Sequence, residues 1–162
     1  VYPQSKQQRC WVHKTANVLN CVPKSVQPKV KDALHQIWQA ETQSDAHQAF
    51  DRFDQLFSAK YPKAVQCLQK DKDELLAFYE FPAMHWQSLR TTNPIESTFS
   101  TIRHRTKRAK GCLSRDGMLQ MMFKLGQCAE QNWRRLRGFE DLNKVITGVK
   151  FKDGMEIKQN AA

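Results

Sequence analysis

A carboxylate followed by a dense run of cations is the part of this sequence best suited to chemistry. Glu96 lies in the stretch 91–103, TTNPIESTFSTIR, and the run 103–110, RHRTKRAK, follows it without an acidic residue. Carboxylates are ligands for hard cations such as Mg²⁺, and Lys and Arg bind phosphates with release of counterions. The combination is typical of a metal site that faces a nucleic-acid backbone.

Glu96 also has a purely structural interpretation. Asn93 is a preferred N-cap and Pro94 suits the first helical position, which places Glu96 third, as in a variant of the capping box. On local sequence alone capping is the stronger interpretation, and only the neighbouring cations favour a metal site. Helical spacing predicts that the same helix buries Ile95, Phe99 and Ile102.

The cationic segment predicts DNA binding. It contains six cations and no acidic residue: Arg103, Arg105, Lys107, Arg108, Lys110 and Arg115. Gly111 and Ser114 add short side chains that let backbone N–H groups approach phosphate oxygens. Arg103 follows Glu96 by seven residues, or about two helical turns, so the two side chains leave the helix from neighbouring stripes. We favour DNA binding over a merely solvated surface.

The spacing Cys10-x-x-His13 could contribute to a zinc site, which would need two further ligands. The other cysteines have no partner at a matching spacing. Residues 8–13, QRCWVH, predict a short buried strand, the only convincing one in the chain. Alternation along a strand places Cys10 and His13 on opposite faces. A packed thiol and a hydrogen-bonded imidazole are therefore favoured over zinc or a Cys–His nucleophile.

The tryptophans divide into two groups. Trp11, Trp38 and Trp133 fit apolar faces and are predicted to lie in the core. Trp86, ten residues before Glu96, could stack on an unpaired base, but burial is favoured for it as well.

Composition and charge restrict the class of protein. The 162 residues carry a net charge of +10, and residues 91–162 hold most of it, which indicates nucleic acid or another anionic surface as partner. Five cysteines without framework spacing predict reduced thiols and a cytoplasmic location. No apolar run has the length of a membrane span, so no membrane partner is expected.

Hydrophobic periodicity predicts a mainly helical chain. After a short helix over 14–22, we expect helices over 27–40 and 44–60, the second capped by Ser44 and burying Leu56, and then shorter pieces to residue 90. Ser114 caps a long helix to about residue 136, whose Met-rich stripe is predicted to be core. A weak helix over 141–146 and a short hairpin over 149–154 complete the chain.

The chain resembles the C-terminal part of the Mutator-family transposases of bacterial insertion sequences. Residues 1–13, VYPQSKQQRCWVH, are similar to the downstream half of the family signature, which ends in Cys-x-x-His. Residues 91–96, TTNPIE, with Arg103 after six intervening positions, are similar to the block around the family's last acidic catalytic residue. His85-Trp86 and residues 105–108 also follow the pattern, and the resemblance extends to about residue 152.

The resemblance implies ribonuclease H-like chemistry, in which two Asp and one Glu hold two Mg²⁺ or Mn²⁺ ions for phosphodiester cleavage and strand transfer. Glu96 matches the Glu and would be the catalytic and metal-binding residue. Asn93 would support its helix, Arg103 would orient Glu96 or a phosphate, and Cys10 with His13 would brace the strand beside the site. Both Asp are expected upstream of Val1. We therefore expect this fragment to bind no metal tightly and to be inactive alone.

The implied fold is the C-terminal part of a ribonuclease H-like α/β catalytic domain with an all-helical insertion. Residues 1–22 would form the last core strand and the following helix, and 23–90 the insertion. Residues 91–137 would form the Glu helix, the basic segment and a long helix, followed by a tail over 138–162. The implied partners are DNA, at the transposon ends and the target, and further copies of the full-length enzyme.

Two alternatives stay open. A non-catalytic helical DNA-binding module, such as a transposition inhibitor, would need the basic run but not Glu96. A remnant with an incomplete fold would have neither activity.

Overall fold

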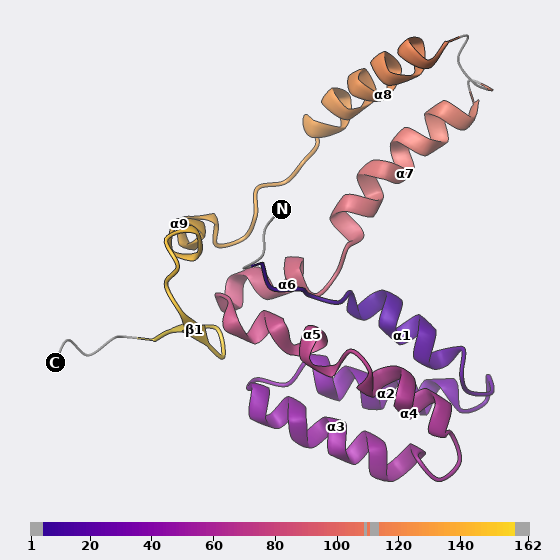
Figure 1. The fold of residues 1–162 in the computed structure, drawn as a ribbon, viewed down its shortest axis with the longest axis vertical. Helices are drawn as coiled ribbons and strands as arrows, with labels where there is room; N and C mark the ends of the chain where they lie inside the picture. Colours follow the sequence, from indigo (N-terminus) through magenta and orange to yellow (C-terminus); the bar gives the residue numbers. More distant parts are fainter. Residues whose placement is uncertain (1–4, 109, 111–113, 158–162) are drawn as a thin grey trace, which may run out of the picture. The chain divides into compact units, whose positions relative to one another are not determined.

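The computed structural model describes residues 5–108, 110 and 114–157 and is mainly helical (Figure 1). Residues 1–4 of the first family-like stretch, and Gly111, lie outside the described residues. In chain order the elements are α1 (Trp11–Leu19), α2 (Gln27–Trp38), α3 (Gln43–Phe57), α4 (Pro62–Gln69), α5 (Lys72–Leu76), η1 (Ala77–Glu80), η2 (Ala83–His85), α6 (Trp86–Leu89), α7 (Asn93–Arg108), α8 (Arg115–Glu130), η3 (Phe139–Asp141), α9 (Leu142–Ile146), β1 (Phe151–Lys152) and β2 (Met155–Glu156).

The chain divides into two compact units. The first consists of Val1–Thr91 together with Arg137–Ala162, and the second of Thr92–Leu136. The first unit therefore joins the beginning of the chain to its end, and the second is an excursion from it.

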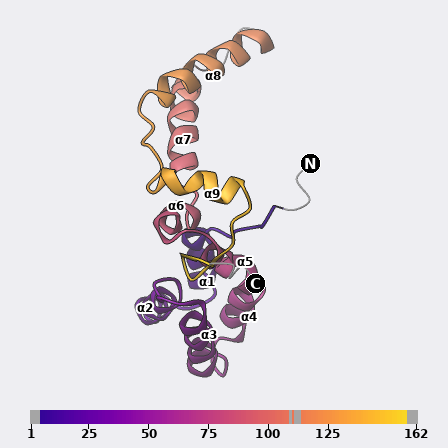
Figure 2. The same cartoon turned by 90° about the vertical axis from the view of Figure 1, so that its left-hand side faces the viewer.

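The core of the first unit lies among α1, α2, α3 and α4, which lie together in both views (Figures 1 and 2). Its largest fully buried side chains are Tyr79, Phe53, Phe78, Leu34, Ile37 and Leu68. Each apolar side chain of this size contributes about 1.5–3 kcal/mol when removed from water. The helix predicted over 27–40 is confirmed as α2, and the first of the shorter helical pieces predicted before residue 90 is α4.

The cap of α3 differs from the sequence prediction. Thr42, not Ser44, stands at the N-cap with extended backbone, and its Oγ1 accepts a hydrogen bond from the Asp45 amide at 3.1 Å. Leu56 was predicted to be buried with Phe53 and Phe57 and is exposed, because it lies just outside the buried stripe that runs through those two residues. The predicted stripe is otherwise confirmed.

The strand predicted over 8–13 is wrong. α1 begins at Trp11, and residues 5–10 have no strand assignment. The Arg9 amide donates to the Glu74 carbonyl and the Trp11 amide to the Arg90 carbonyl, both at 2.9 Å, so helical segments satisfy this backbone. The segment is helical because Trp11, Lys14 and Val18 form a buried stripe at helical spacing. The prediction failed because one member of this stripe is a lysine, which breaks the apolar pattern in the sequence.

The C-terminal tail packs onto the first unit. The predicted hairpin is confirmed, since β1 pairs antiparallel with β2. Among the residues that the structure describes, β1 and β2 are the only strands. Asp153 and Gly154 form its two-residue turn with φ of 49° and 79°, as Asp-Gly turns require. Gly154 donates to the Tyr79 carbonyl and accepts from the Ala83 amide, each at 3.2 Å. The tail is thereby part of the unit and not an appendage.

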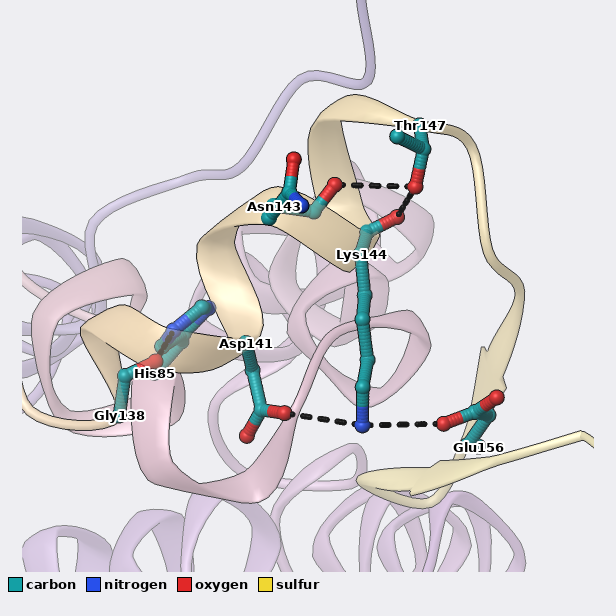
Figure 3. A network of polar contacts seen from close by, with 7 residues as sticks. All are labelled: His85, Gly138, Asp141, Asn143, Lys144, Thr147 and Glu156. Carbon is teal, nitrogen blue, oxygen red and sulfur yellow. Dashed lines mark hydrogen bonds and ion pairs between the residues drawn. The ribbon is translucent and has the colours of Figure 1, made fainter.

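A polar network fixes the approach to this hairpin (Figure 3). His85 Nε2 lies 2.8 Å from the carbonyl oxygen of Gly138, directly after the second unit ends. Lys144 Nζ lies 3.1 Å from Glu156 Oε2 and 3.2 Å from Asp141 Oδ1, which ties α9 to β2. Hydrogen bonding to Glu156, and then to Asp141, raises the pKa of Lys144.

The second unit is a helical hairpin in which α7 contacts α8. The predicted Ser114 cap is confirmed, since its Oγ accepts from the Gly117 amide at 3.1 Å. α8 ends at Glu130 rather than near Leu136.

α7 begins at Asn93, which was predicted to be its N-cap. The Glu96 amide donates to the Thr92 carbonyl at 2.9 Å, so Thr92 takes the capping place predicted for Asn93.

The core predicted for this unit is wrong in large part. Of its described hydrophobic side chains only Ile102 is buried. The exposed ones are Ile95, Phe99, Met118, Leu119, Met122, Phe123 and Trp133. Two helices in contact can cover only one stripe of each other, and α8 carries apolar residues on several sides. Periodicity identified the stripes correctly, but two helices do not provide enough partner surface to bury them.

Candidate functional site

Glu96 lies in the first turn of α7, with its side chain exposed. The Thr92 hydroxyl donates a hydrogen bond to Glu96 Oε1 from the preceding turn. The positive end of the helix dipole favours a carboxylate at this place. This geometry agrees with a structural role of Glu96 at the N-terminus of α7. Because the Glu96 side chain is exposed, its carboxylate is also accessible to solvent.

The six cations of the predicted DNA-binding segment are all exposed. Arg103, Arg105, Lys107 and Arg108 project from the second half of α7, where the negative end of the helix dipole favours cations. Lys110 follows in a left-handed backbone conformation with φ of 52°, and Arg115 begins α8. No ion pair engages any of the six within the described part of the chain. Residues 92–136 hold nine Lys/Arg and three Asp/Glu, a net charge of +6.

An open groove of about 520 Å³ lies between α7 and α8. Phe99, Ile102, Arg103, Thr106 and Lys107 line it from α7, and Met118 and Met122 from α8. Ile102 is buried at its floor, whereas Phe99 is 53% exposed. The groove therefore combines an apolar floor and an accessible aromatic ring with two cations, and its lining includes no carboxylate.

Asn93, predicted to support the Glu96 helix, is the first residue of α7, whereas Cys10, His13 and Trp86 belong to the first unit. Cys10 is buried immediately before α1, and His13 is exposed on that helix. The Trp86 ring packs edge-on against Phe78 and Tyr79, with centroids 5.2 and 4.9 Å apart, and its Nε1 donates to the Phe81 carbonyl at 2.9 Å. Trp86 is thus engaged in the core, as the burial alternative predicts.

No group of three or more His, Cys, Asp and Glu residues that could hold a metal ion occurs in ranges 5–108 and 114–157. In the same ranges, no helix has both the length and the apolar character needed to cross a membrane. The described residues therefore present cations and three separate carboxylates on the second unit, but not a group of ligands that could hold a metal ion.

Comparison with known proteins assigns the family. The model of the family described as "Transposase, Mutator family" matches residues 1–135. The chain belongs to the Mutator family of transposases. The transposase for insertion sequence element IST2 of Acidithiobacillus ferrooxidans is 54% identical over 154 residues, which are 95% of this chain and 52% of that protein. The transposase for IS6120 of Mycolicibacterium smegmatis is 47% identical over 159 residues, 98% of this chain and 49% of that protein.

Relatives of lower identity match a shorter part. The transposase for IS905 of Lactococcus lactis is 36% identical over 107 residues, 66% of this chain and 27% of that protein. The chain spans about half the length of the two Mutator-family transposases named first. These matches agree with the resemblance carried by the two sequence stretches.

Sequence analysis missed two structural features of this Mutator-family chain. Arg90 lies over three aromatic rings, with Cζ 5.1 Å from the Phe78 centroid, 5.3 Å from that of Trp38 and 5.9 Å from that of Trp86. Burial lowers the pKa of Arg90, whose guanidinium also donates to the Trp38 carbonyl. No local pattern indicates a ring cluster drawn from separate helices.

The groove of the second unit was missed for a different reason. Its apolar residues were assigned to the core because their helical spacing is that of a core stripe. The signal that could have found it was the four-residue spacing of Phe99, Arg103 and Lys107, which places an aromatic ring and two cations on one face of the helix.

Proposed function

We propose that this chain is the DNA-binding, acid-contributing C-terminal part of a transposase that cleaves and rejoins DNA. The observation that carries the proposal is the exposed cationic segment of α7 and α8, on a unit with a net charge of +6. Cations without carboxylate partners can neutralise phosphates at little desolvation cost. The family relatives are transposases of insertion sequences, which supports DNA as the partner.

Glu96 is proposed as one acidic residue of an Asp-Asp-Glu site that would use Mg²⁺ or Mn²⁺ in a complete, ribonuclease H-like enzyme. The described residues do not fit such a site by themselves, because Glu96 is not part of any group of three potential ligands. Hard divalent cations need several fixed oxygen ligands. We therefore derive no catalytic step from this chain, and we expect the 162-residue polypeptide not to cleave or join DNA.

A non-catalytic DNA-binding module is the second candidate. The hydrogen bond from Thr92 to Glu96 favours it, because it gives the carboxylate a structural role that requires no metal. In this case Glu96 contributes to α7 and the cations alone carry the function.

Substitution of Glu96 and Lys107 separates the two candidates. Affinity is measured by fluorescence anisotropy for a 30-base-pair duplex, and strand transfer in Mg²⁺ is measured in a chimera that joins this chain to the N-terminal half of the IST2 transposase. We expect Lys107→Ala to weaken binding several-fold in both proteins, whereas Glu96→Gln leaves binding unchanged and abolishes strand transfer. Lys31→Ala, an exposed lysine of α2, is the matched control.

Four results would contradict parts of the proposal. Strand transfer by an active chimera that tolerates Glu96→Gln would leave only the binding module. Metal-dependent strand transfer by the 162-residue chain alone would overturn the expected inactivity. Equal effects of Lys107→Ala and Lys31→Ala would remove the cationic segment as the DNA site. Normal chimera activity with Cys10→Ser would remove the proposed brace by Cys10 and His13.

A further inference from the structure

We propose that the groove between α7 and α8 binds an unpaired nucleobase of a DNA strand whose phosphates are held by Arg103 and Lys107. The inference rests on the proposed function and adds to it a class of DNA structure. It assigns three exposed apolar residues of the second unit, Phe99, Met118 and Met122, to a ligand, although their helical spacing predicts a core.

The groove is lined by apolar side chains from both helices. Ile102 forms a buried apolar floor, and Met118 and Met122 form the opposite wall from α8. Phe99 lines the groove from α7 and is 53% exposed, so part of its ring is accessible to a ligand. Base–aromatic stacking is a general mode of single-strand binding, because every base has a π-face.

Arg103 and Lys107 lie one turn apart on the α7 side of the groove and are both exposed. The remaining cations of the segment continue along the same helix and into the loop after it. A strand that places one base on Phe99 therefore meets cations on the two turns that follow it, at Arg103 and Lys107. A cationic path beside an aromatic ring is the arrangement found in single-strand binding grooves.

A paired base is excluded as the occupant. In a duplex the faces of each base are covered by its neighbours, and only the edges are accessible in the grooves. The groove offers apolar surface and one hydroxyl, of Thr106, which suits a base face far better than a base edge. A frayed end, a single-stranded end or an extruded base presents that face.

A second copy of this chain is a poorer occupant. Its own second unit carries a net charge of +6, so two such units would bring like charges together. An acidic amphipathic protein segment has the right charge, and it is treated as a competing outcome of the experiment.

The experiment compares an unpaired base with a paired one. The 162-residue chain is titrated against an oligothymidine 20-mer containing one central 2-aminopurine, and against a blunt duplex of mixed sequence with the same label. Affinity is measured by anisotropy and stacking by 2-aminopurine quenching. The variants are Phe99→Ala, Phe99→Leu and Phe99→Trp. Phe123→Ala is the control, because Phe123 is 63% exposed on α8 and does not line the groove.

We expect Phe99→Ala and Phe99→Leu to lower single-strand affinity about tenfold and to reduce quenching, with duplex affinity changed less than about twofold. Phe99→Trp should retain both signals, and Phe123→Ala should resemble the unsubstituted chain. Because Phe99 is largely exposed, far-UV circular dichroism should show unchanged helix content.

Other results overturn the inference in distinguishable ways. Duplex and single-strand binding without quenching, or an equal effect of Phe99→Ala and Phe123→Ala, would refute the base site and leave the proposed function intact. Failure to bind either DNA would refute both. Saturable binding of a Leu/Glu amphipathic 20-mer that is lost in Phe99→Ala, with DNA binding unaffected, would assign the groove to a protein segment.

Discussion

The backbone amide of Gln43 donates a 2.7 Å hydrogen bond to the carboxylate of Asp153, 110 positions later in the chain. Gln43 is the first residue of α3 and Asp153 is in the turn of the C-terminal hairpin. A residue of the tail thus satisfies an amide that the helix leaves without an internal partner. The tail is a structural component of the helical unit.

Asp153→Ala should lower the free energy of unfolding by about 2 kcal/mol, through the lost bond to a charged acceptor and the strain of alanine at a φ of 49°. Asp153→Asn keeps an acceptor oxygen and tolerates the left-handed conformation, so it should cost less than about 1 kcal/mol. Urea unfolding monitored by far-UV circular dichroism measures both. Equal costs would show that the bond to Gln43 contributes little.

Gly138→Ala should destabilise the junction between the tail and the first unit by about 2 kcal/mol. Gly138 has a φ of 65°, and an added Cβ would lie 2.6 Å from Cβ of Met84. Gly126→Ala is the control, because α8 leaves open space there and alanine should stabilise the helix by about 0.5–1 kcal/mol. Urea unfolding of both variants measures the two changes in unfolding free energy, which should have opposite signs. Protease cleavage after residue 138 reports the opening of the junction in Gly138→Ala.

Lys14→Met should cost about 3 kcal/mol of unfolding free energy, because it leaves a carboxylate without its buried partner. Lys14 is 3% exposed, pairs with Asp71 and donates to the Cys67 carbonyl at 2.8 Å. The double substitution Lys14→Met with Asp71→Asn should recover part of the loss, since it removes a carboxylate left with the exposed Arg9, 3.3 Å away, as its ion-pair partner. A double variant no more stable than Lys14→Met would indicate that the bond to Cys67 dominates.

The same pair predicts a dependence on acid pH. The hydrogen bond from Lys14 is the main cause that lowers the pKa of Asp71 below its ordinary value of 3.8. The stabilisation is therefore complete above that value and is lost as the pH falls through the folded-state pKa. The stability difference between the unsubstituted chain and Lys14→Met should shrink below about pH 4. Thermal unfolding between pH 2.5 and pH 7 tests this directly.

The raised pKa of Tyr79 predicts a loss of folding stability at alkaline pH. Burial raises the pKa of Tyr79 to about 12 from its ordinary 10.0, and its hydroxyl donates to the Ala40 carbonyl at 2.7 Å. Above pH 10 the unfolded chain loses this proton first, so stability should fall by about 1.4 kcal/mol per pH unit until about pH 12. Tyr79→Phe should cost about 1 kcal/mol at pH 8 and lack this component of the alkaline loss. Urea unfolding of both proteins at pH 8, 10 and 11 gives the comparison.

Arg108→Ala should make DNA binding less sensitive to salt. Each neutralised phosphate contributes about 0.9 to the slope of log affinity against log salt, so the slope should decrease by about one. Arg108 is exposed at the end of α7 and does not line the groove. Lys31→Ala on α2 should leave the slope unchanged. Titrations between 50 and 200 mM salt measure the effect, and an unchanged slope for Arg108→Ala would place this residue outside the DNA interface.

Local sequence determined much of this protein. The phases of α2 and α4, the cap at Ser114 and the Asp-Gly hairpin follow from residues within a few positions of each other, because helix periods, caps and turns are local physics. The cationic segment and the family stretches were readable for the same reason, and the family assignment is confirmed.

Tertiary structure decided which apolar and charged surfaces are covered. Lys14 is buried because Asp71 and Cys67 lie opposite it, and it completes a buried helical stripe of α1 with Trp11, which was predicted to lie in a strand. Phe99 and Met118 have the spacing of core residues, yet they stay exposed because α7 and α8 have only each other as partners within their unit. Spacing along a chain specifies which face of an element is apolar, but burial depends on what segments distant in sequence bring against that face.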